Sequence, residues 1–311
     1  MKRFGSVLVV ASDEAATSSL LEAAVDLARR NGASVTLFDV LEPLSERRRF
    51  LRSSIGEIDL ESLLAETRVG ELQDLASQTT DYPVEVEIVF GTKFVEVIRR
   101  VVARGHDLVM ASPEESKRRF GLAGASDTMH LLRKSPVPVW VDSGRRDQGP
   151  DVAVALGPIE PDHQHEALNI SLLELASSLA ARRGGSLHVI HAWRLEGESL
   201  LRSSRVGTSA LAVDGLVDEA RHEAAVGLKS LLDQVPTIEV PIVEHLEKGE
   251  AGDVISSVVD RVEPGVVVMG TLARAGLKGV IMGNTAERVL AGIDSSILAV
   301  KPPGFTSPVI Q

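Results

Sequence analysis

The chain has 311 residues, of which 44% are hydrophobic and only 3% aromatic, so we expect two domains with aliphatic cores. Its 44 acidic residues outnumber its 33 basic ones and give a formal net charge of -11, which argues against a nucleic-acid-binding protein. The absence of cysteine excludes disulfides, thiolate metal sites and cysteine nucleophiles. The sequence has no signal-peptide pattern and no apolar run of about 18 residues, so we expect a cytoplasmic protein without membrane insertion.

Short β-branched runs alternate with helical patterns from the N-terminus onward. Residues 7–11 are typical of a buried strand, and residues 15–30 place apolar side chains on one helical face, with Gly32 expected to end that helix. Further elements of this half are expected as strands at 34–40, 84–90, 108–111 and 137–141 and a helix at 94–104. Strands separated by helices indicate βαβ crossovers and a parallel, doubly wound sheet.

Four motifs of the first half recur in the second half in the same order, 150 to 159 residues later. The pairs are Arg29–Val35 with Arg182–Leu187, Leu51–Ser54 with Leu201–Ser204, Gly91 with Gly249, and Val109-Met110-Ala111-Ser112 with Val268-Met269-Gly270-Thr271. Because the order never changes, we interpret the chain as a duplication.

The duplication sets the expected domain boundaries. We predict a first domain at 1–143, a polar linker at 144–150 and a second domain at 151–305. The second copy has a longer first loop, 158–165, before a helix at 167–182. Long segments after the second strand of each copy contain helical patterns at 60–76 and 216–232, which we interpret as covering helices.

The segment with the clearest chemistry follows the buried run 266–269. It is glycine-rich from Gly270 to Gly279 and ends at Gly283-Asn284-Thr285, before a helix expected at 286–291. Loops at the carboxyl ends of central strands bind ligands in open α/β sheets, and glycines let backbone N–H groups approach phosphate oxygens. Asn284 and Thr285 stand at the expected N-cap of the next helix, and Arg274 and Lys278 can add charge-assisted contacts.

This segment resembles the Gly-x2-Gly-x9-Gly-Ser/Thr signature of the universal stress protein family, with Gly270 first, Ala273 at the second glycine and Gly283-Asn284 at the close. Four segments resemble the tandem subgroup called universal stress protein E. They are Gly283–Glu287, Val300–Phe305, His165–Asn169 and Leu131–Pro136. The resemblance covers about residues 5–305.

The resemblance implies that the second copy binds ATP, with or without Mg²⁺. The nucleotide-binding residues that it implies are Ala192, Met269, Gly270, Thr271, Ala273, Arg274, Gly276, Gly283, Asn284 and Thr285. Two positions depart from the family pattern: Ala273 replaces a glycine, and the aspartate that usually follows the first strand is replaced by Leu156-Gly157.

The first copy departs further from the signature. Aligned on its fourth strand, Gly270 corresponds to Ala111, Ala273 to Glu114 and Gly276 to Lys117, while Ser12 stands in place of the aspartate. A carboxylate repels phosphate, so we expect no ATP binding in this copy.

Two groups of histidines have residue types that can bind a metal ion. His163 and His165, with Asp162 and Glu166, favour a solvated polar loop over a zinc site. His188 and His191 have odd spacing in one strand and therefore face opposite sides of the sheet. We predict no metal site and no catalytic residue.

The fold class that we predict is α/β: two doubly wound, five-stranded parallel sheets of order 3-2-1-4-5 with helices on both faces. The leading function is a stress-response binding or regulatory protein whose second domain binds ATP or a related nucleotide. One alternative is a weak ATPase or phosphotransferase, although the loop offers no evident general base. Another is a scaffold for a lipid-like ligand in an apolar space left in the first copy.

Partners follow from the resemblance as well. It implies that the two copies pair through their last strands, 137–141 and 297–300, as an intramolecular pseudo-dimer. Pro138 suits an edge strand because it lacks a backbone donor. Association of two chains into a homodimer stays open.

Overall fold

The computed structural model describes residues 4–44, 50–53, 56–113, 126–145, 149–159, 163–203, 209–235, 239–271, 283, 286, 288–289 and 292–310. It divides into two compact units. We call them the N-terminal unit, Met1–Gly144 with Thr306–Gln311, and the C-terminal unit, Arg145–Phe305.

The N-terminal unit contains a parallel sheet whose described strands have the neighbour order β5-β2-β1-β6-β7. The bounds of these strands are β1 (Ser6–Val10), β2 (Ser34–Leu41), β5 (Val84–Phe90), β6 (Leu108–Ala111) and β7 (Val139–Val141). Counted along the chain this is the expected order 3-2-1-4-5, so the doubly wound fold is confirmed for this unit. The predicted ranges of β5 and β6 are confirmed residue for residue.

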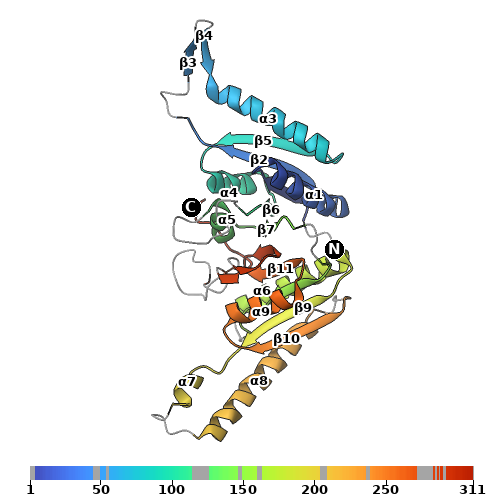
Figure 1. Ribbon diagram of the computed structural model, residues 1–311, viewed down its shortest axis with the longest axis vertical. Helices are drawn as coiled ribbons and strands as arrows, with labels where there is room; N and C mark the ends of the chain where they lie inside the picture. Colours follow the sequence, from blue (N-terminus) through green and yellow to red (C-terminus); the bar gives the residue numbers. More distant parts are fainter. Residues whose placement is uncertain are drawn as a thin grey trace. The chain divides into compact units, whose positions relative to one another are not determined.

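Helices cover this sheet in two pairs, α1 (Glu14–Asn31) with α3 (Leu60–Thr79) and α4 (Lys93–Arg104) with α5 (Asp127–Lys134). Figure 1 shows α3 running along the side of the unit that carries β5. Local sequence sets the helix ends. The Asp13 side chain accepts a hydrogen bond from the amide of Ala16, and Gly32 ends α1 with a left-handed φ of 64°, as predicted.

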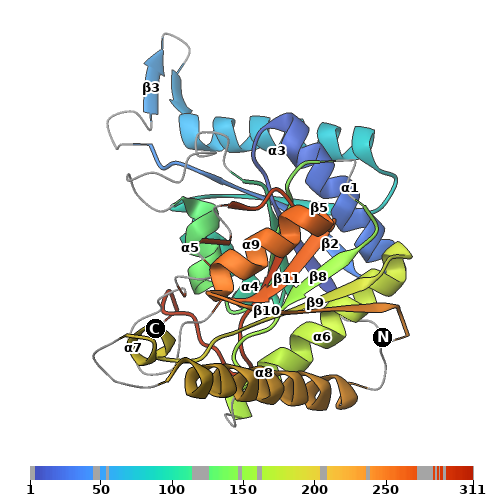
Figure 2. The same cartoon turned by 60° about the horizontal axis from the view of Figure 1, so that its bottom comes forward.

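The C-terminal unit repeats the arrangement with the neighbour order β10-β9-β8-β11-β12. Its parallel strands are β8 (Val152–Ala155), β9 (Leu187–Trp193), β10 (Ile242–Lys248), β11 (Val266–Gly270) and β12 (Ser296–Val300). Its described helices are α6 (His163–Arg183), α7 (Glu198–Leu201), α8 (Ala210–Asp233) and α9 (Ala251–Val262). In Figure 2, α9 lies on one side of these strands and α6 and α8 on the other.

Several features differ from the prediction, among them the start of β7 at Val139 rather than at residue 137, which leaves Pro138 just before the strand. An antiparallel hairpin, β3 (Phe50–Ser53) with β4 (Gly56–Asp59), precedes α3 and was not expected (Figure 1). Helix α6 begins at His163 rather than at 167, so part of the expected loop is its first turn. Helix α8 begins at Ala210 because the Ser209 hydroxyl caps the amide of Ala212, six residues before the expected start.

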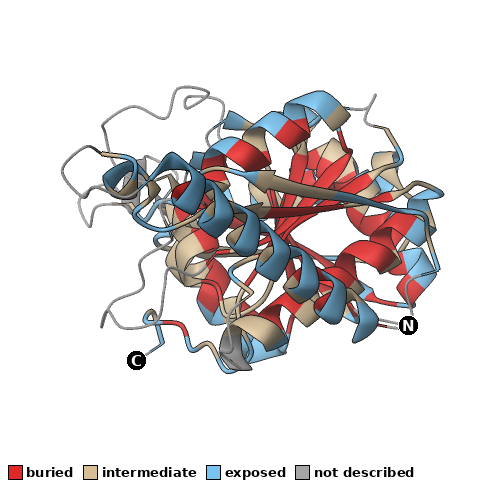
Figure 3. Ribbon diagram, turned by 90° about the horizontal axis from the view of Figure 1, so that it is seen from below, coloured by how far each residue is buried: buried red, intermediate tan, exposed pale blue. Residues whose placement is uncertain are grey.

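The cores are aliphatic, as the composition predicts. Figure 3 shows buried residues gathered along the central strands and exposed residues on the outward faces of helices. Every residue of β6, β8 and β12 is buried. Such continuous apolar strands are typical of a parallel sheet covered on both faces, which leaves the strand ends as the places for polar chemistry.

Candidate functional site

The backbone registers define which residues of the two units are equivalent. Val7 of β1 pairs with Leu108 of β6, and Val152 of β8 pairs with Val266 of β11. The amide of Gly91 donates to the carbonyl of Leu41, and the amide of Gly249 donates to that of Trp193. These pairings make β1, β2 and β6 of the N-terminal unit the counterparts of β8, β9 and β11 of the C-terminal unit.

This equivalence corrects one part of the sequence comparison. Counting on from Leu108 and Val266 makes Ser112 the counterpart of Gly270 and Ala111 the counterpart of Met269. The predicted match of Gly270 with Ala111 is therefore wrong by one residue. Glu114 and Lys117, the other two residues in that comparison, lie outside the described residues.

In the N-terminal unit an ion cluster lies at the carboxyl end of β2. Asp39 has a side chain only 7% exposed, and it accepts a hydrogen bond from Arg68 Nε of α3 at 2.8 Å. Lys93 Nζ, from the first residue of α4, lies 3.7 Å from the other carboxylate oxygen. A buried carboxylate is tolerated here because two cations from covering helices face it.

The same cations reach the ends of the neighbouring strands. Arg68 Nη2 donates to the carbonyl of Ser12 at 3.4 Å, and Lys93 Nζ donates to the carbonyl of Ala11 at 3.1 Å. The hydroxyls of Ser12 and Ser112 lie 2.8 Å apart. The carboxyl ends of β1, β2 and β6 thus carry polar side chains of the chain itself, which bond to one another and to the strand-end carbonyls.

The equivalent positions of the C-terminal unit carry smaller or uncharged residues. Gly157 is the counterpart of Ser12, and Gly270 is the counterpart of Ser112, so the C-terminal unit lacks both serine hydroxyls at these positions. Ala251, the first residue of α9, stands for Lys93. His191 stands for Asp39, so the C-terminal unit has neither the acid nor the lysine of the ion cluster.

His191 is a buried, neutral group in this unit. Burial lowers the pKa of its imidazole to about 4. Among the described residues, its Nδ1 and the indole nitrogen of Trp193 have no hydrogen-bond partner. The two side chains lie on the same face of β9 because they are two residues apart.

The loop after β8 is fixed by Asn169 of α6. The amide of Gly157 donates to Asn169 Oδ1 at 2.9 Å, and Asn169 Nδ2 donates to the carbonyl of Pro158 at 3.4 Å. A cavity of about 200 Å³ adjoins this loop and is lined also by Ile159 and by residues of α8 such as Leu231. Gly157 therefore lies in a loop that is fixed by Asn169 and adjoins a small cavity.

The two described ends of the glycine-rich segment meet. The amide of Gly283 donates to the carbonyl of Thr271 at 3.4 Å, and the amide of Thr271 donates to the carbonyl of Val300 at 3.2 Å. Gly270 is the last residue of β11 and pairs with Val300 of β12. The segment therefore leaves and returns at one point, the carboxyl end of β11.

The expected nucleotide-binding residues divide into two groups. Gly270, Thr271 and Gly283 come together at this point, Met269 is buried in β11 just before it, and Ala192 lies one residue before the end of β9. The remaining expected residues, Ala273, Arg274, Gly276, Asn284 and Thr285, lie outside the described residues.

Lys301 is a member of this site that the sequence analysis did not assign. It follows β12 directly, and its Nζ donates to Thr271 Oγ1 at 2.6 Å. Burial lowers the pKa of the ammonium group to about 7. The sequence pattern that could have identified Lys301 is a lysine placed immediately after a buried strand. That strand, β12, pairs with β11, which ends in Gly270.

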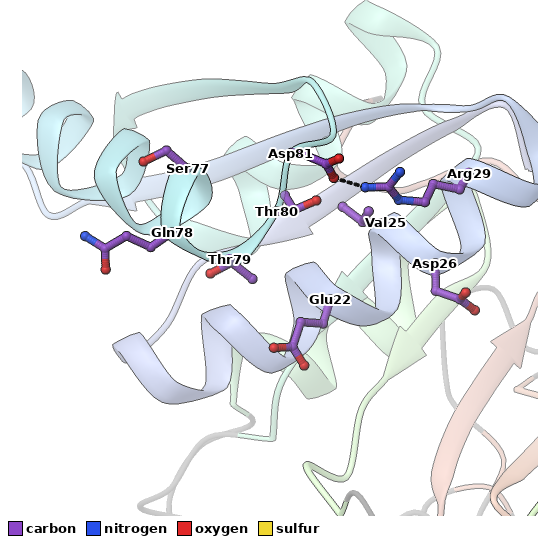
Figure 4. A pocket seen from close by; sticks show the side chains of 9 residues that line it. All are labelled: Glu22, Val25, Asp26, Arg29, Ser77, Gln78, Thr79, Thr80 and Asp81. Atoms are coloured by element: carbon purple, nitrogen blue, oxygen red, sulfur yellow. Dashed lines mark hydrogen bonds and ion pairs between the residues drawn. The ribbon is translucent and has the colours of Figure 1, made fainter.

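A larger hollow of about 460 Å³ lies elsewhere, between α1 and the end of α3 in the N-terminal unit (Figure 4). Glu22, Asp26, Arg29 and Asp81 line it, and Arg29 is ion-paired with Asp81 across it. The last turns of α1 and α3 lead back to the amino ends of the strands. The hollow is therefore at the edge of the sheet opposite to the one where ligands bind in this fold.

The two groups of histidines with the residue type of metal ligands lie in α6 and in β9. His163 and His165 lie in the first turn of α6, and Asp162 lies outside the described residues. His188 Nδ1 lies 2.9 Å from His245 Nε2 and so is used within the sheet. The described part of the chain contains no group of three or more potential ligands that could hold a metal ion.

Across the described ranges, no helix is both long enough and apolar enough to cross a bilayer.

The duplicated fold and the glycine-rich segment match a known family. The chain matches the Universal stress protein family twice, over residues 3–142 and 162–301. It therefore belongs to the universal stress protein family, as a tandem member with two copies of the domain. Membership supports a role in the stress response.

Similar proteins extend over the full tandem. The chain is 26% identical to universal stress protein E of Salmonella typhi, over 99% of this chain and 98% of that protein. It is 25% identical to universal stress protein E of Escherichia coli (strain K12), over the same shares. A putative universal stress protein from Pseudomonas aeruginosa UCBPP-PA14 has the same fold, with a TM-score of 0.68, 22% identity and coverage of 97% of this chain and 94% of that one.

Proposed function

We propose that the C-terminal unit binds ATP or a related nucleotide, with or without Mg²⁺, and that this binding serves a regulatory role in the stress response. One observation carries the proposal. Where the N-terminal unit fills its strand ends with Asp39, Lys93 and Ser12, the C-terminal unit has His191, Ala251 and Gly157. Because these residues do not bring the charged side chains that occupy the strand ends of the N-terminal unit, we place the ligand in the C-terminal unit.

The groups at the end of β11 have the chemistry that a phosphate requires. The Thr271 hydroxyl and the Lys301 ammonium lie in contact there, and the amide of Gly283 donates a hydrogen bond to the carbonyl of Thr271. Hydrogen-bond donors and a cation at the carboxyl end of a central strand favour an anionic ligand.

We place the nucleoside end of the ligand on the β8 side of the phosphate. Gly157 and Pro158 are held by Asn169 beside the 200 Å³ cavity. Since the family's usual aspartate is missing, recognition of the nucleoside would depend on shape and on backbone groups such as those of Ala192.

Isothermal titration calorimetry with ATP, ADP and AMP tests the proposal, with and without Mg²⁺. Gly283→Val should abolish binding by obstructing the return of the loop to Thr271. Ala251→Leu should weaken binding by roughly tenfold or more, because it fills, without adding a charge, the position that Lys93 occupies in the N-terminal unit. Lys93→Ala, at the equivalent position of the N-terminal unit, is the matched control and should leave the affinity unchanged.

Each outcome has a definite meaning. Heat from no nucleotide, with a folded parent protein, would remove the nucleotide proposal, and native mass spectrometry of freshly purified protein would then identify any other bound ligand. Equal binding by the parent and by Gly283→Val would move the site away from this loop. Phosphate release that disappears in Gly283→Val would favour the weak ATPase instead.

A further inference from the structure

Two histidines on neighbouring strands of the C-terminal unit form a hydrogen-bonded pair. His188 Nδ1 of β9 lies 2.9 Å from His245 Nε2 of β10, and the two rings are stacked with their centroids 5.2 Å apart. The outer nitrogen of each ring also has a partner. His188 Nε2 lies 3.6 Å from a carboxylate oxygen of Asp151, the residue before β8. His245 Nδ1 lies 3.4 Å from Arg261 Nη2 of α9, so all four ring nitrogens are in use.

The chemistry of the outer partners fixes the position of each ring proton in the neutral pair. A guanidinium group can only donate, so His245 Nδ1 accepts from Arg261 and the ring proton of His245 lies on Nε2. That proton is donated to His188 Nδ1, so the ring proton of His188 lies on Nε2 and faces Asp151. Both neutral rings are therefore Nε2–H tautomers, and the contacts run in one direction from α9 to the start of β8.

An added proton cannot enter this chain of contacts without breaking it. With three protons on the four ring nitrogens, either both facing nitrogens carry a proton and the bond between the rings is lost, or His245 Nδ1 carries one and the bond from Arg261 is lost. Asp151 favours a first proton on His188, which costs only the contact with Arg261. A second proton places two positive rings against each other beside Arg261, where like charges repel.

The charges around the pair agree with this order of protonation. Among the described residues, the charged groups that face the pair are Asp151, Glu247 and Arg261. Glu247 of β10 is itself ion-paired with Arg261. Burial lowers the pKa of His245, and the neighbouring His188 and Arg261 lower it further. The closed pair is therefore a poor site for a second proton.

The N-terminal unit holds its equivalent strand with charges that are permanent near neutral pH. The pairing of β2 with β5 and of β9 with β10 makes Glu87 the counterpart of His245. Glu87, with a side chain 12% exposed, is ion-paired with Arg100 and Arg104 of α4. Carboxylates and guanidinium groups keep their charges between pH 5 and 8, so one unit has a constant contact where the other has a titratable one.

Strand β10 is weakly held apart from this contact. Among the described strands of its unit it pairs only with β9 (Figure 1), and none of its seven residues is buried. We propose that His188 and His245 form an acid-sensitive latch: the neutral pair holds β10 and the end of α9 against β9, and uptake of a second proton by the pair releases them.

The expected pH dependence has a definite size and direction. Histidines in the released strand titrate near the ordinary value of about 6.5, so the latch is closed above that pH. Each proton that the open form binds and the closed form does not bind favours opening as the pH falls. For one such proton, the equilibrium constant for opening increases by roughly 20- to 30-fold between pH 7 and pH 5.

Hydrogen exchange of the full chain at pH 7 and pH 5, corrected for the pH dependence of intrinsic amide exchange, measures this opening. The protection of β10 should fall by roughly 20- to 30-fold more than that of β5. A double variant, His188→Thr with His245→Glu, gives β9 and β10 the residues of their counterparts Thr36 and Glu87, with Arg261 opposite the new carboxylate. It should keep the protection of β10 at pH 5.

Two further variants complete the set. His245→Gln keeps a donor and an acceptor but cannot titrate, so it should also keep the protection of β10 at pH 5. His222→Gln, on an exposed position of α8, is the matched control and should lose protection as the parent does. Thermal unfolding at pH 7 confirms that each variant is folded.

Ring ¹⁵N chemical shifts test the proton positions independently of exchange. At pH 7.5 both His188 and His245 should be Nε2–H tautomers. An Nδ1–H tautomer at His245 would overturn the order of protonation on which the latch depends. An equal loss of β10 protection in the parent and in both histidine-pair variants, or no loss in the parent, would overturn the latch itself.

Discussion

Asp39 of β2 and His191 of β9 stand at the same position of the two units, yet one is a paired carboxylate and the other a neutral imidazole. Asp39 is held by Arg68 and Lys93, whereas burial keeps His191 uncharged by lowering its pKa to about 4. Both units thus have a buried polar residue at this strand end, which is a charged carboxylate in the N-terminal unit and an uncharged imidazole in the C-terminal unit. Two predictions follow from the pair.

The first concerns the ion cluster of the N-terminal unit. Asp39→Asn leaves Arg68 and Lys93 without their carboxylate, and we expect a loss of about 2 to 3 kcal/mol in the free energy of unfolding. Adding Arg68→Met to Asp39→Asn should recover part of that loss. Urea denaturation followed by Trp140 fluorescence, in a Trp193→Phe background, measures both.

The exposed ion pair Arg30–Asp26 on α1 is the matched control, with side chains 50% and 65% exposed. Arg30→Met should change the free energy of unfolding by less than about 1 kcal/mol. An Asp39→Asn loss no larger than this would contradict the importance that we assign to the buried cluster.

The second prediction concerns acid sensitivity of the C-terminal unit. The folded-state pKa of His191 is about 4, below the value of 6.5 expected for an unfolded histidine, so its contribution is fully present above pH 6.5. As the pH falls toward 4 the unfolded state binds the proton first, and up to about 3 kcal/mol is lost. Burial also lowers the pKa of His245, which adds a loss of the same sign.

Urea denaturation between pH 7 and pH 4 measures this slope through Trp193, in a Trp140→Phe background. His191→Leu should make the loss smaller, because the substituted side chain cannot titrate. An unchanged pH dependence in His191→Leu would show that His191 is not kept neutral by burial.

A third prediction compares two adjacent glycines before β9. A Cβ on Gly185 would collide with the backbone carbonyl of Pro150, whereas a Cβ on Gly184 meets nothing within 4 Å. Gly184 has a left-handed φ of 70°, so Gly184→Ala should cost about 1 kcal/mol. Gly185→Ala must displace backbone, and we expect a loss of at least about 2 kcal/mol. Equal losses in thermal or urea unfolding would contradict this reasoning.

A fourth prediction follows from the proposed nucleotide site. A ligand at a concentration of 100 times its Kd should stabilise the unit that binds it by about 2.7 kcal/mol. Hydrogen exchange with and without ATP should show increased protection of β11 and β12. Protection of β1 and β6, where Ser12 and Ser112 are already hydrogen-bonded, should change less, and the reverse result would place the ligand in the N-terminal unit.

The sequence predicted the strands and the duplication well, because buried parallel strands are continuous apolar runs that differ sharply from the helices between them. The ranges of β5 and β6 needed no adjustment. The hairpin β3–β4 was missed, since Phe50–Asp59 mixes charged, polar and apolar residues without a clear alternation. The start of α8 was predicted too late because the capping residue Ser209 sets it, and Ser209 precedes the regular apolar pattern.

The site was predicted less completely, for a different reason. Matching Met110 with Met269 gave the wrong register by one residue, because every residue near these strand ends is apolar or small and only backbone pairing fixes the alignment. The contact of Arg68 with Asp39 joins residues 29 positions apart, and that of Lys301 with Thr271 joins residues 30 apart. Neither spacing belongs to a local motif, so only the folded chain brings these residues together.

The closed strand ends of the N-terminal unit have one more consequence. Arg68 and Lys93 are tethered to the chain, so their effective concentration at Asp39 does not vary with the contents of the cell. That half of the molecule therefore keeps a constant stability, while the stability of a half that awaits a diffusible ligand follows the supply of that ligand. With the ligand site that we propose in the C-terminal unit, one polypeptide would combine a half of fixed stability with a half whose stability reports the ligand.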